Sequence, residues 1–299
     1  MIQVERLTKK FQTYTALNQI SVSVQPGSVF GLVGSNGAGK STLLRTIAGI
    51  YKPDSGTVAI DGTPIFEHPN VKNDIFFISD FPYFIPQSNM KEMAKFYASM
   101  YSNWSHERYR ELCSLFPIEE KMKISSMSKG MQRQVALICA LSTQPKVLLM
   151  DEIFDGLDPV MRQLLKKLLA REVSERNITV MIASHNLREL EDVCDHVGLL
   201  HKGGILLSRD LDEMKMNLHK VQCVLKEGTR PEDIEGLEIL KTERRGKLLT
   251  LTVRGELGRV EYLMQKAEPV FYETIPLSLE EIFISETEVV GYDVKKLIF

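Results

Sequence analysis

Apolar residues recur at two different spacings along this chain, and the spacing predicts where strands and helices lie. Over residues 1 to about 65 the texture is that of strands and turns, and Ile20–Val24 alternates apolar with polar residues as a half-buried strand does. From Met90 to Phe116, apolar residues instead recur every three or four positions, which predicts helix. Short apolar runs predict buried strands, and they lie at 29–33, 75–78, 147–150, 179–183 and 197–200.

The later part of this pattern alternates strands with helices. Residues 159–174 and 186–194 have helical spacing and lie between predicted strands. Strands that alternate with helices favour a predominantly parallel α/β sheet. After about residue 211 the chain changes to charged, strand-like segments such as 220–225 and 248–253. We therefore expect a second, small α+β domain at the C-terminal end.

One segment, Gly34–Thr42, has the sequence GSNGAGKST of a complete phosphate-binding loop. It follows the predicted strand 29–33 and precedes a helical stretch, which is the context that such a loop needs. Its glycines permit backbone angles that turn N–H groups toward phosphates, and the start of the next helix attracts anions. Lys40 can neutralise phosphate oxygens, and the Ser41 hydroxyl can ligate Mg²⁺. The sequence predicts that a nucleoside triphosphate is bound by Gly34, Ser35, Asn36, Gly37, Ala38, Gly39, Lys40, Ser41 and Thr42.

Two adjacent acids, Asp151 and Glu152, follow the apolar run 147–150. In parallel sheets, ligands are bound at the carboxyl ends of the strands. Buried carboxylates without a partner are costly, so packing alone does not explain this pair. With a phosphate-binding loop upstream, we expect Asp151 to hold Mg²⁺ and Glu152 to polarise the attacking water.

Composition narrows the class of protein. The chain has 299 residues, of which 43% are hydrophobic and 25% charged, as in globular proteins of one large or two modest domains. A net charge of −2 gives no reason to expect nucleic acid as a partner. No apolar run reaches the roughly 18 residues of a membrane span, and the start lacks the layout of a signal peptide. The four scattered cysteines are typical of reduced thiols in a cytosolic protein.

Three further short motifs appear in a particular order. Residues 127–134, MSKGMQRQ, resemble the signature segment usually written LSGGQ, and residues 155–159, DGLDP, resemble a D-loop. Ser184-His185-Asn186 resembles a switch histidine that follows a strand. With the phosphate-binding loop and the two acids, their order and spacing over residues 1–210 resemble the ATP-binding subunit of an ATP-binding cassette (ABC) transporter.

That resemblance implies a fold and a domain organisation. It implies a P-loop ATPase core of the α/β class over residues 1–210, with an antiparallel β subdomain and a helical subdomain at about 88–142. Residues 211–299 form a small C-terminal α+β accessory domain to which no chemistry is assigned, although 278–283 resemble the segment that closes many drug-exporter cassettes. Aromatic residues of the helical subdomain could form a groove for a membrane partner or simply pack its core.

The resemblance also implies site roles. Glu152 and His185 are the expected catalytic residues, with His185 orienting the water and the γ-phosphate. A second cassette would present its signature segment to the same nucleotide, and the expected binding residues there are Ser128, Lys129, Gly130, Met131 and, in the D-loop, Asp158. Phe11 occupies the position of the ring that stacks on adenine, with Tyr14 as the alternative, and either ring could be core packing.

This chain departs from the common family pattern at two places. The signature has Lys129 and Met131, a form that resembles the bacterial branch of bacitracin and other peptide-antibiotic exporters. At the Q-loop, where a glutamine normally ligates Mg²⁺, the strand 75–78 is followed by Asp80. Gln87 follows a proline and imitates the motif, but strand position favours Asp80. The expected metal ligands are thus Ser41, Asp80 and Asp151.

The resemblance predicts a Mg²⁺-dependent ATPase that powers a separately encoded transmembrane permease, in the direction of export. It implies an identical or different second ATPase subunit and a cytoplasmic location, peripheral on the inner face of the cell membrane. One alternative is a soluble ABC ATPase that acts on ribosomes or DNA, although such proteins usually carry two cassettes or a long coiled-coil insertion. Another is a sensory or regulatory ABC subunit.

Overall fold

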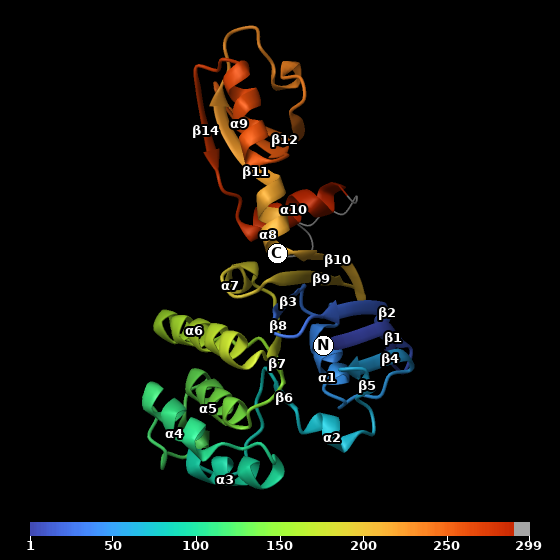
Figure 1. Ribbon diagram of the computed structural model, residues 1–299, viewed down its shortest axis with the longest axis vertical. Helices are drawn as coiled ribbons and strands as arrows, with labels where there is room; N and C mark the ends of the chain where they lie inside the picture. The colour runs from blue at the N-terminus through green and yellow to red at the C-terminus, as the bar shows by residue number, and fades with distance from the viewer. Residues whose placement is uncertain (290–299) are drawn as a thin grey trace. The chain divides into compact units, whose positions relative to one another are not determined.

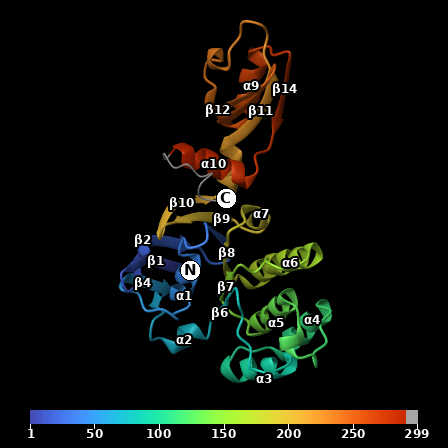
Figure 2. The ribbon, with the colours of Figure 1, turned by 180° about the vertical axis from the view of Figure 1, so that it is seen from behind.

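The structure is a computed structural model that describes residues 1–289, with side chains through Ser285. It divides into two compact units between Ser208 and Arg209, two residues before the boundary expected from the sequence. We describe each unit by itself (Figures 1 and 2).

The first unit begins with a four-stranded sheet in the order β2-β1-β4-β5. Its strands are β1 (Ile2–Phe11), β2 (Tyr14–Val24), β4 (Ser55–Ile60) and β5 (Thr63–Pro64). β1 pairs antiparallel with both β2 and β4, and the apolar residues of the alternating pattern point into one core. This sheet is the antiparallel β subdomain that the sequence predicts.

A six-stranded sheet in the order β10-β9-β3-β8-β7-β6 forms the centre of the first unit. The run from β9 through β3, β8 and β7 to β6 is parallel, and all residues of β3, β7 and β8 are buried. The carboxyl ends of these three strands therefore meet at one edge, where ligands bind in parallel sheets. The strands are β3 (Val29–Val33), β6 (Ile75–Ile78), β7 (Val147–Asp151), β8 (Thr179–Ser184), β9 (His196–His201) and β10 (Gly204–Asp210).

Helices connect these strands. α1 (Lys40–Ile47) follows β3, the short α2 (Pro69–Lys72) precedes β6, and α6 (Pro159–Arg176) and α7 (Leu187–Leu190) follow β7 and β8. Both views show α3 to α6 on one side of the central sheet, with the antiparallel sheet on the other (Figures 1 and 2). The sequence predicts helix over 186–194, but α7 ends at Leu190, so this helix is shorter than predicted.

The helical subdomain contains three main helices, α3 (Met90–Met100), α4 (His106–Leu115) and α5 (Lys129–Ser142), and a short turn, η1 (Ile124–Ser126). The prediction of helical structure from Met90 through Phe116 is wrong at its middle. Tyr101 is extended, and Ser105 begins a new helix by accepting a hydrogen bond from the Arg108 amide. Apolar spacing does not detect such a break, because both helices keep the same period.

The second unit is an α+β domain, as predicted. Its sheet has the order β12-β13-β11-β14, and all three of its strand pairs are antiparallel. Residues of β11, β13 and α9, including Val221, Leu251 and Val260, form a core on one sheet face. The elements are α8 (Leu211–Asn217), β11 (Leu218–Val224), η2 (Pro231–Asp233), β12 (Glu238–Arg245), β13 (Leu248–Arg254), α9 (Leu257–Lys266), β14 (Phe271–Ile275) and α10 (Leu279–Val289).

All four cysteines are free thiols. Among residues 1–289, no helix combines the length and the apolar character needed to cross a bilayer.

Candidate nucleotide-binding and hydrolysis site

The phosphate-binding loop lies between β3 and α1, as the sequence predicts. The buried Lys40 ammonium donates to the Gly34 carbonyl oxygen at 2.6 Å and lies 3.4 Å from that of Ser35. Gly39 has a φ of 111°, and a Cβ there would lie 2.7 Å from the Ala16 carbonyl oxygen, so no other residue fits. The loop thus curls around the lysine at the start of α1, where backbone N–H groups favour an anion.

Asp151, the last residue of β7, is only 1% exposed. Neither carboxylate oxygen has a hydrogen-bond partner among the residues that the structure describes. Burial raises the pKa of Asp151, and the charges of Glu152 and Asp80 raise it further, while the nearby Ser41 hydroxyl opposes the shift. A buried acid without partners is costly, so these oxygens and the Ser41 hydroxyl fit a hard cation such as Mg²⁺.

Glu152 lies between the phosphate-binding loop and the switch histidine. Its Oε1 is 3.4 Å from the Lys40 Nζ, and its Oε2 is 2.9 Å from His185 Nδ1. The His185 amide also donates to Oε2 at 3.2 Å. Glu152 has a φ of 49°, a backbone conformation that costs about 1–3 kcal/mol for a residue with a side chain. The structure therefore brings together three residues that are far apart in the sequence.

The segment that carries His185 is fixed by neighbours that sequence reasoning missed. The buried Ser184 hydroxyl donates to Glu189 Oε2 at 3.0 Å and accepts from the Asn186 amide at 3.0 Å. Burial raises the pKa of Glu189, although Ser184 and Arg162 oppose this shift. Apart from the strand that precedes it, nothing in the sequence pattern marks Glu189 as a support for this loop.

The signature segment begins α5. The Ser128 hydroxyl caps the helix by accepting from the Met131 amide at 3.2 Å. Ser128 and Lys129 are exposed, and the Lys129 ammonium lies 5.6 Å from the centre of the Phe81 ring. Gly130 is buried, and a Cβ there would lie 2.5 Å from the Gly156 carbonyl oxygen. The start of α5 thus packs on the D-loop of the same chain and leaves the cap residue accessible.

Two D-loop acids have different surroundings. Asp158 caps α6, because its Oδ1 accepts from the amides of Val160 and Met161, both at 2.9 Å. Ligand atoms of Asp155, Glu152 and His185 all lie within 4.8 Å of one another. Asp155 therefore lies beside Glu152 and His185, whereas a contact from Asp158 to nucleotide stays a prediction.

The two Q-loop candidates make different contacts. Asp80, two residues after β6, forms an ion pair with Arg133 at 2.5 Å. Gln87 accepts from the Lys123 ammonium at 2.9 Å. The charge of Asp80 contributes to the raised pKa of Asp151, whose main cause is burial. Asp80 thus acts electrostatically at the proposed metal site, and its role as a ligand stays a prediction.

Both candidate adenine rings lie at the turn between β1 and β2, where Phe11 and Tyr14 are paired in register. Phe11 packs edge-on against Tyr51 at 5.3 Å between ring centres. The Tyr14 hydroxyl lies 3.4 Å from the Gly37 carbonyl oxygen, within the phosphate-binding loop. Both rings are exposed, and Tyr51 is a third aromatic that the sequence analysis did not single out.

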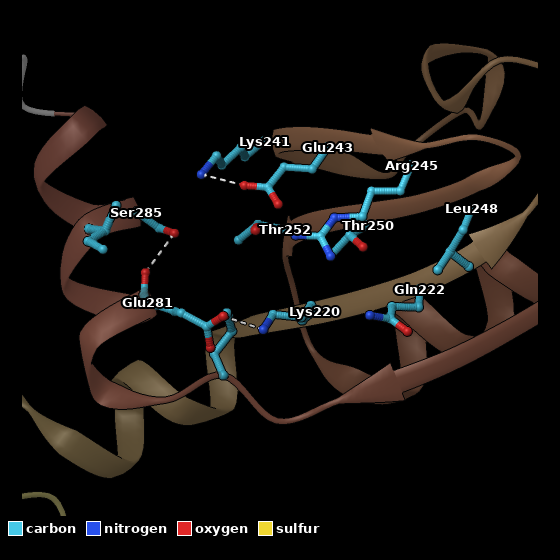
Figure 3. Close-up of a pocket in the computed structure, with 12 residues that line it drawn as sticks. Lys220, Gln222, Lys241, Glu243, Arg245, Leu248, Thr250, Thr252, Glu281 and Ser285 are labelled. Carbon is cyan, nitrogen blue, oxygen red and sulfur yellow. Dashed lines mark hydrogen bonds and ion pairs between the residues drawn. The ribbon is translucent and has the colours of Figure 1, made fainter. Parts of the chain in front are cut away.

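The second unit contains a polar pocket of about 260 Å³ on the sheet face opposite its core (Figure 3). Thr252 of β13 is paired with Lys220 of β11 and with Lys241 of β12. The Lys220 ammonium pairs with Glu281, and Lys241 lies 2.9 Å from Glu243. The other residues that line the pocket are Gln222, Arg245, Leu248, Thr250, Leu277, Ile284 and Ser285.

Comparisons with known proteins identify the family of this chain. The family model described as ABC transporter matches residues 17–155. The ABC transporter ATP-binding protein YtrB of Bacillus subtilis is 29% identical over 96% of this chain and 98% of its own length. The bacitracin transport ATP-binding protein BcrA of Bacillus licheniformis is 30% identical over 74% of this chain and 73% of its own. A solved ATP-binding subunit of an ABC transporter superposes with a TM-score of 0.67 and 26% identity, over 72% of this chain and 92% of its own.

The fold, the arrangement of the phosphate-binding loop, acids and histidine, and these similarities lead to one conclusion. The chain belongs to the ABC transporter family, as an ATP-binding subunit with a P-loop ATPase fold and ATPase activity.

Proposed function

We propose that this subunit hydrolyses Mg²⁺-ATP to power a separately encoded transmembrane permease, in the direction of export. The observation that carries the proposal is the meeting of Lys40, Glu152 and His185 beside the buried Asp151, whose carboxylate oxygens accept no hydrogen bond from the described residues. These groups provide a cation for phosphate, a base, an orienting imidazole and a ligand for a divalent cation. Export is favoured by the similarity to a bacitracin transport protein and by Lys129 and Met131 of the signature.

In the proposed reaction, Lys40 moves its ammonium from the loop carbonyls to the phosphate oxygens. Ser41 and Asp151, with Asp80 nearby, would hold Mg²⁺, which would supply positive charge to neutralise the phosphates. Glu152 accepts a proton from the attacking water, and His185 orients that water and the γ-phosphate. The contact of Glu152 with both Lys40 and His185 supports these roles, because it places the base between the phosphate loop and the switch residue.

Two chains form the complete site in this proposal. Ser128 and Lys129 are exposed at the N-terminal end of α5, where a hydroxyl and backbone N–H groups can bind an anion. Gly130 and Met131 complete this surface. A second cassette, identical or different, would place its own γ-phosphate there, so that two nucleotides lie between the two subunits. Asp158 of the D-loop would lie beside the same nucleotide.

A membrane partner is supported by exposed apolar side chains in and before the helical subdomain. Phe81, Tyr83 and Ile85 follow the Q-loop, and Phe96 and Met100 lie on α3, all of them exposed. Monomeric proteins seldom leave groups of large apolar residues in water, and such groups mark interaction surfaces. A permease loop that docks here would hold the subunit on the cytoplasmic face of the cell membrane.

The test is the substitution Glu152→Gln, which removes the base but keeps the shape of the side chain. Turnover should fall roughly 100-fold or more, because general-base catalysis contributes that much. Since both anion-binding surfaces are intact, size-exclusion chromatography with Mg²⁺-ATP should show a stable dimer. The matched control is Glu107→Gln, an exposed residue of α4, which should behave as wild type. A Glu152→Gln protein that stays monomeric with wild-type turnover would contradict the proposal.

A further inference from the structure

The side chain of Arg133 connects three segments near Asp151 and Glu152: the start of α5, the segment after β6 and the D-loop after β7. It lies on α5, only 6% exposed, in the first part of the helix that the signature segment begins. Its Nη2 donates to Asp80 Oδ1 at 2.5 Å and to the Asp80 carbonyl oxygen at 3.3 Å. Its Nη1 donates to the carbonyl oxygen of Asp155 in the D-loop. One side chain of the signature helix therefore binds both the segment after β6 and the segment after β7.

Those two segments leave the sheet side by side. β6 and β7 are parallel neighbours, with Ile78 paired with Met150, so Asp80 and Asp151 follow adjacent strand ends. The start of α5 approaches the D-loop at a second point, because a Cβ on Gly130 would lie 2.5 Å from the Gly156 carbonyl oxygen. The Q-loop, the signature helix and the D-loop are thus connected beside the catalytic acids.

We infer that Arg133 is a positioning residue for ATP hydrolysis, which holds Asp80 and the D-loop backbone in fixed places beside Asp151 and Glu152. The planar guanidinium suits this role because it donates in two directions at once, to a carboxylate and to a backbone carbonyl. A lysine has one point charge and cannot make the same pair of contacts. The inference deepens the proposed function and rests on its assignment of Asp151 and Glu152 to the hydrolysis of ATP.

Arg133 is buried, whereas the side chain of Asp80 is 33% exposed. Removing Asp80 leaves the buried guanidinium without its counter-charge, whereas removing both charges restores neutrality. The loss of the Asp155 contact, however, follows from any change at Arg133. The effects of changes at Asp80 and Arg133 should therefore be non-additive, with turnover set mainly by the state of Arg133.

The experiment uses the full chain and compares Arg133→Gln, Arg133→Lys, Asp80→Asn and the double variant Asp80→Asn/Arg133→Gln. Arg133→Gln should lower kcat roughly tenfold, as small displacements of catalytic groups do, and leave KM for ATP within about twofold. Arg133→Lys should recover little of this loss. The double variant should be no slower than Arg133→Gln. The control is Arg110→Gln, an exposed residue of α4, which should retain wild-type turnover.

Hydrogen exchange of the chain without nucleotide provides a measurement that does not depend on turnover. Amides of residues 153–158 should exchange faster in Arg133→Gln, while those of residues 34–42 should not change. If Arg133→Gln does not fold, the double variant is compared with Asp80→Asn alone, and it should show lower kcat and faster exchange at 153–158.

Three results would overturn the inference: wild-type kcat in the folded Arg133 variants, additive losses in the double variant, or unchanged exchange at 153–158. These outcomes are separable from failure of the proposed function. A chain that never pairs with a permease or a second cassette would still show the exchange difference, because that difference is measured on the chain alone.

Discussion

The nucleotide site and the pocket of the second unit both combine lysines with acids, but they treat the acids in opposite ways. In the nucleotide site, Asp151 is buried with neither oxygen hydrogen-bonded within the described chain, and burial raises its pKa. In the pocket, Glu281 accepts hydrogen bonds from Lys220 and from Ser278, and although burial opposes the effect, these donors lower its pKa.

The difference separates a site that awaits a charged ligand from a polar surface that is already paired. An acid without partners has free ligand capacity, at a cost that a bound cation removes. An acid that is paired with lysine already has its charge compensated, so it gains less from a bound cation. We therefore expect nucleotide binding and hydrolysis to depend on the residues of the first unit and not on the pocket of the second.

The largest expected difference is in ATP affinity, between variants that each replace one lysine of the two sites. Lys40→Met should weaken ATP binding roughly 10- to 100-fold, because charge-assisted hydrogen bonds are worth about 1.5–3 kcal/mol. Lys220→Met, which removes a pocket lysine, should leave ATP affinity unchanged. Fluorescent-nucleotide titration measures both variants. Equal losses of affinity in the two variants would show that the pocket contributes to nucleotide binding.

The second prediction concerns Asp80, which strand position favours over Gln87 for the place of the usual Q-loop glutamine. Asp80→Asn should raise the Mg²⁺ concentration needed for half-maximal turnover by roughly 3- to 10-fold, with ATP affinity less affected, because it removes a charge beside the metal site. Asp80→Gln should be milder, since it restores the usual ligand. Turnover measured against Mg²⁺ concentration separates these effects.

The competing interpretation is that Asp80 only caps the following turn, or only pairs with Arg133. A closed structure with Mg²⁺-ATP decides between them. Asp80 at more than about 6 Å from the metal, with no bridging water, would rule out the ligand role.

The residues of this site that could be predicted from the sequence are those that directly follow a strand. The loop containing Lys40, the acids Asp151 and Glu152, and His185 each follow a short apolar run, and parallel strands bring such ends together. Arg133 has no such marker, because it lies 53 residues from Asp80 and its helix is buried almost throughout. Only the packing of α5 against the end of β6 reveals it.

The pocket of the second unit could not be predicted from the sequence, because its residues come together only through strand pairing. The strand-like segments 220–225 and 248–253 indicated β11 and β13, but not which strands pair or in what register. Lys220 and Lys241 lie on either side of Thr252 only because β13 is the central neighbour of both β11 and β12. The helix break at Tyr101 was missed because it depends on capping by Ser105 rather than on hydrophobic spacing.

The third prediction uses the raised pKa of Asp151. A carboxyl whose pKa is raised by folding stabilises the fold when protonated, and this contribution is lost as the pH rises through the raised value. Asp151→Asn removes the charged form, so without nucleotide it should raise the melting temperature at pH 7 by roughly 2–4 °C, equivalent to about 1 kcal/mol. The advantage should shrink toward pH 4.

Thermal unfolding in EDTA between pH 4 and 8 makes this measurement. Mg²⁺-ATP should reverse the order of the two proteins, since only wild type keeps the acidic ligand. The contrasting control is Glu281→Gln. The lowered pKa of the Glu281 carboxyl implies a stabilising contribution that is present above the ordinary pKa and is lost as the pH falls. Because Glu281 is partly exposed, the effect of this substitution should stay below about 1 kcal/mol. An Asp151→Asn protein that is less stable at pH 7 would show that its carboxylate has partners in solution.

The smallest expected effect on ATP affinity comes from deleting the second unit. Removing residues 211–299 should leave ATP affinity within about threefold of the full chain, because every residue assigned to the nucleotide lies before residue 186 and the first unit has its own core. The deletion keeps all of β10, which ends at Asp210, so the central sheet stays intact. Dimer stability or assembly with the permease should be affected instead, and ATP-driven dimerisation of a truncated Glu152→Gln chain measures the first of these. A folded truncation that loses ATP binding would contradict this prediction, since it would show that residues 211–299 complete the nucleotide site.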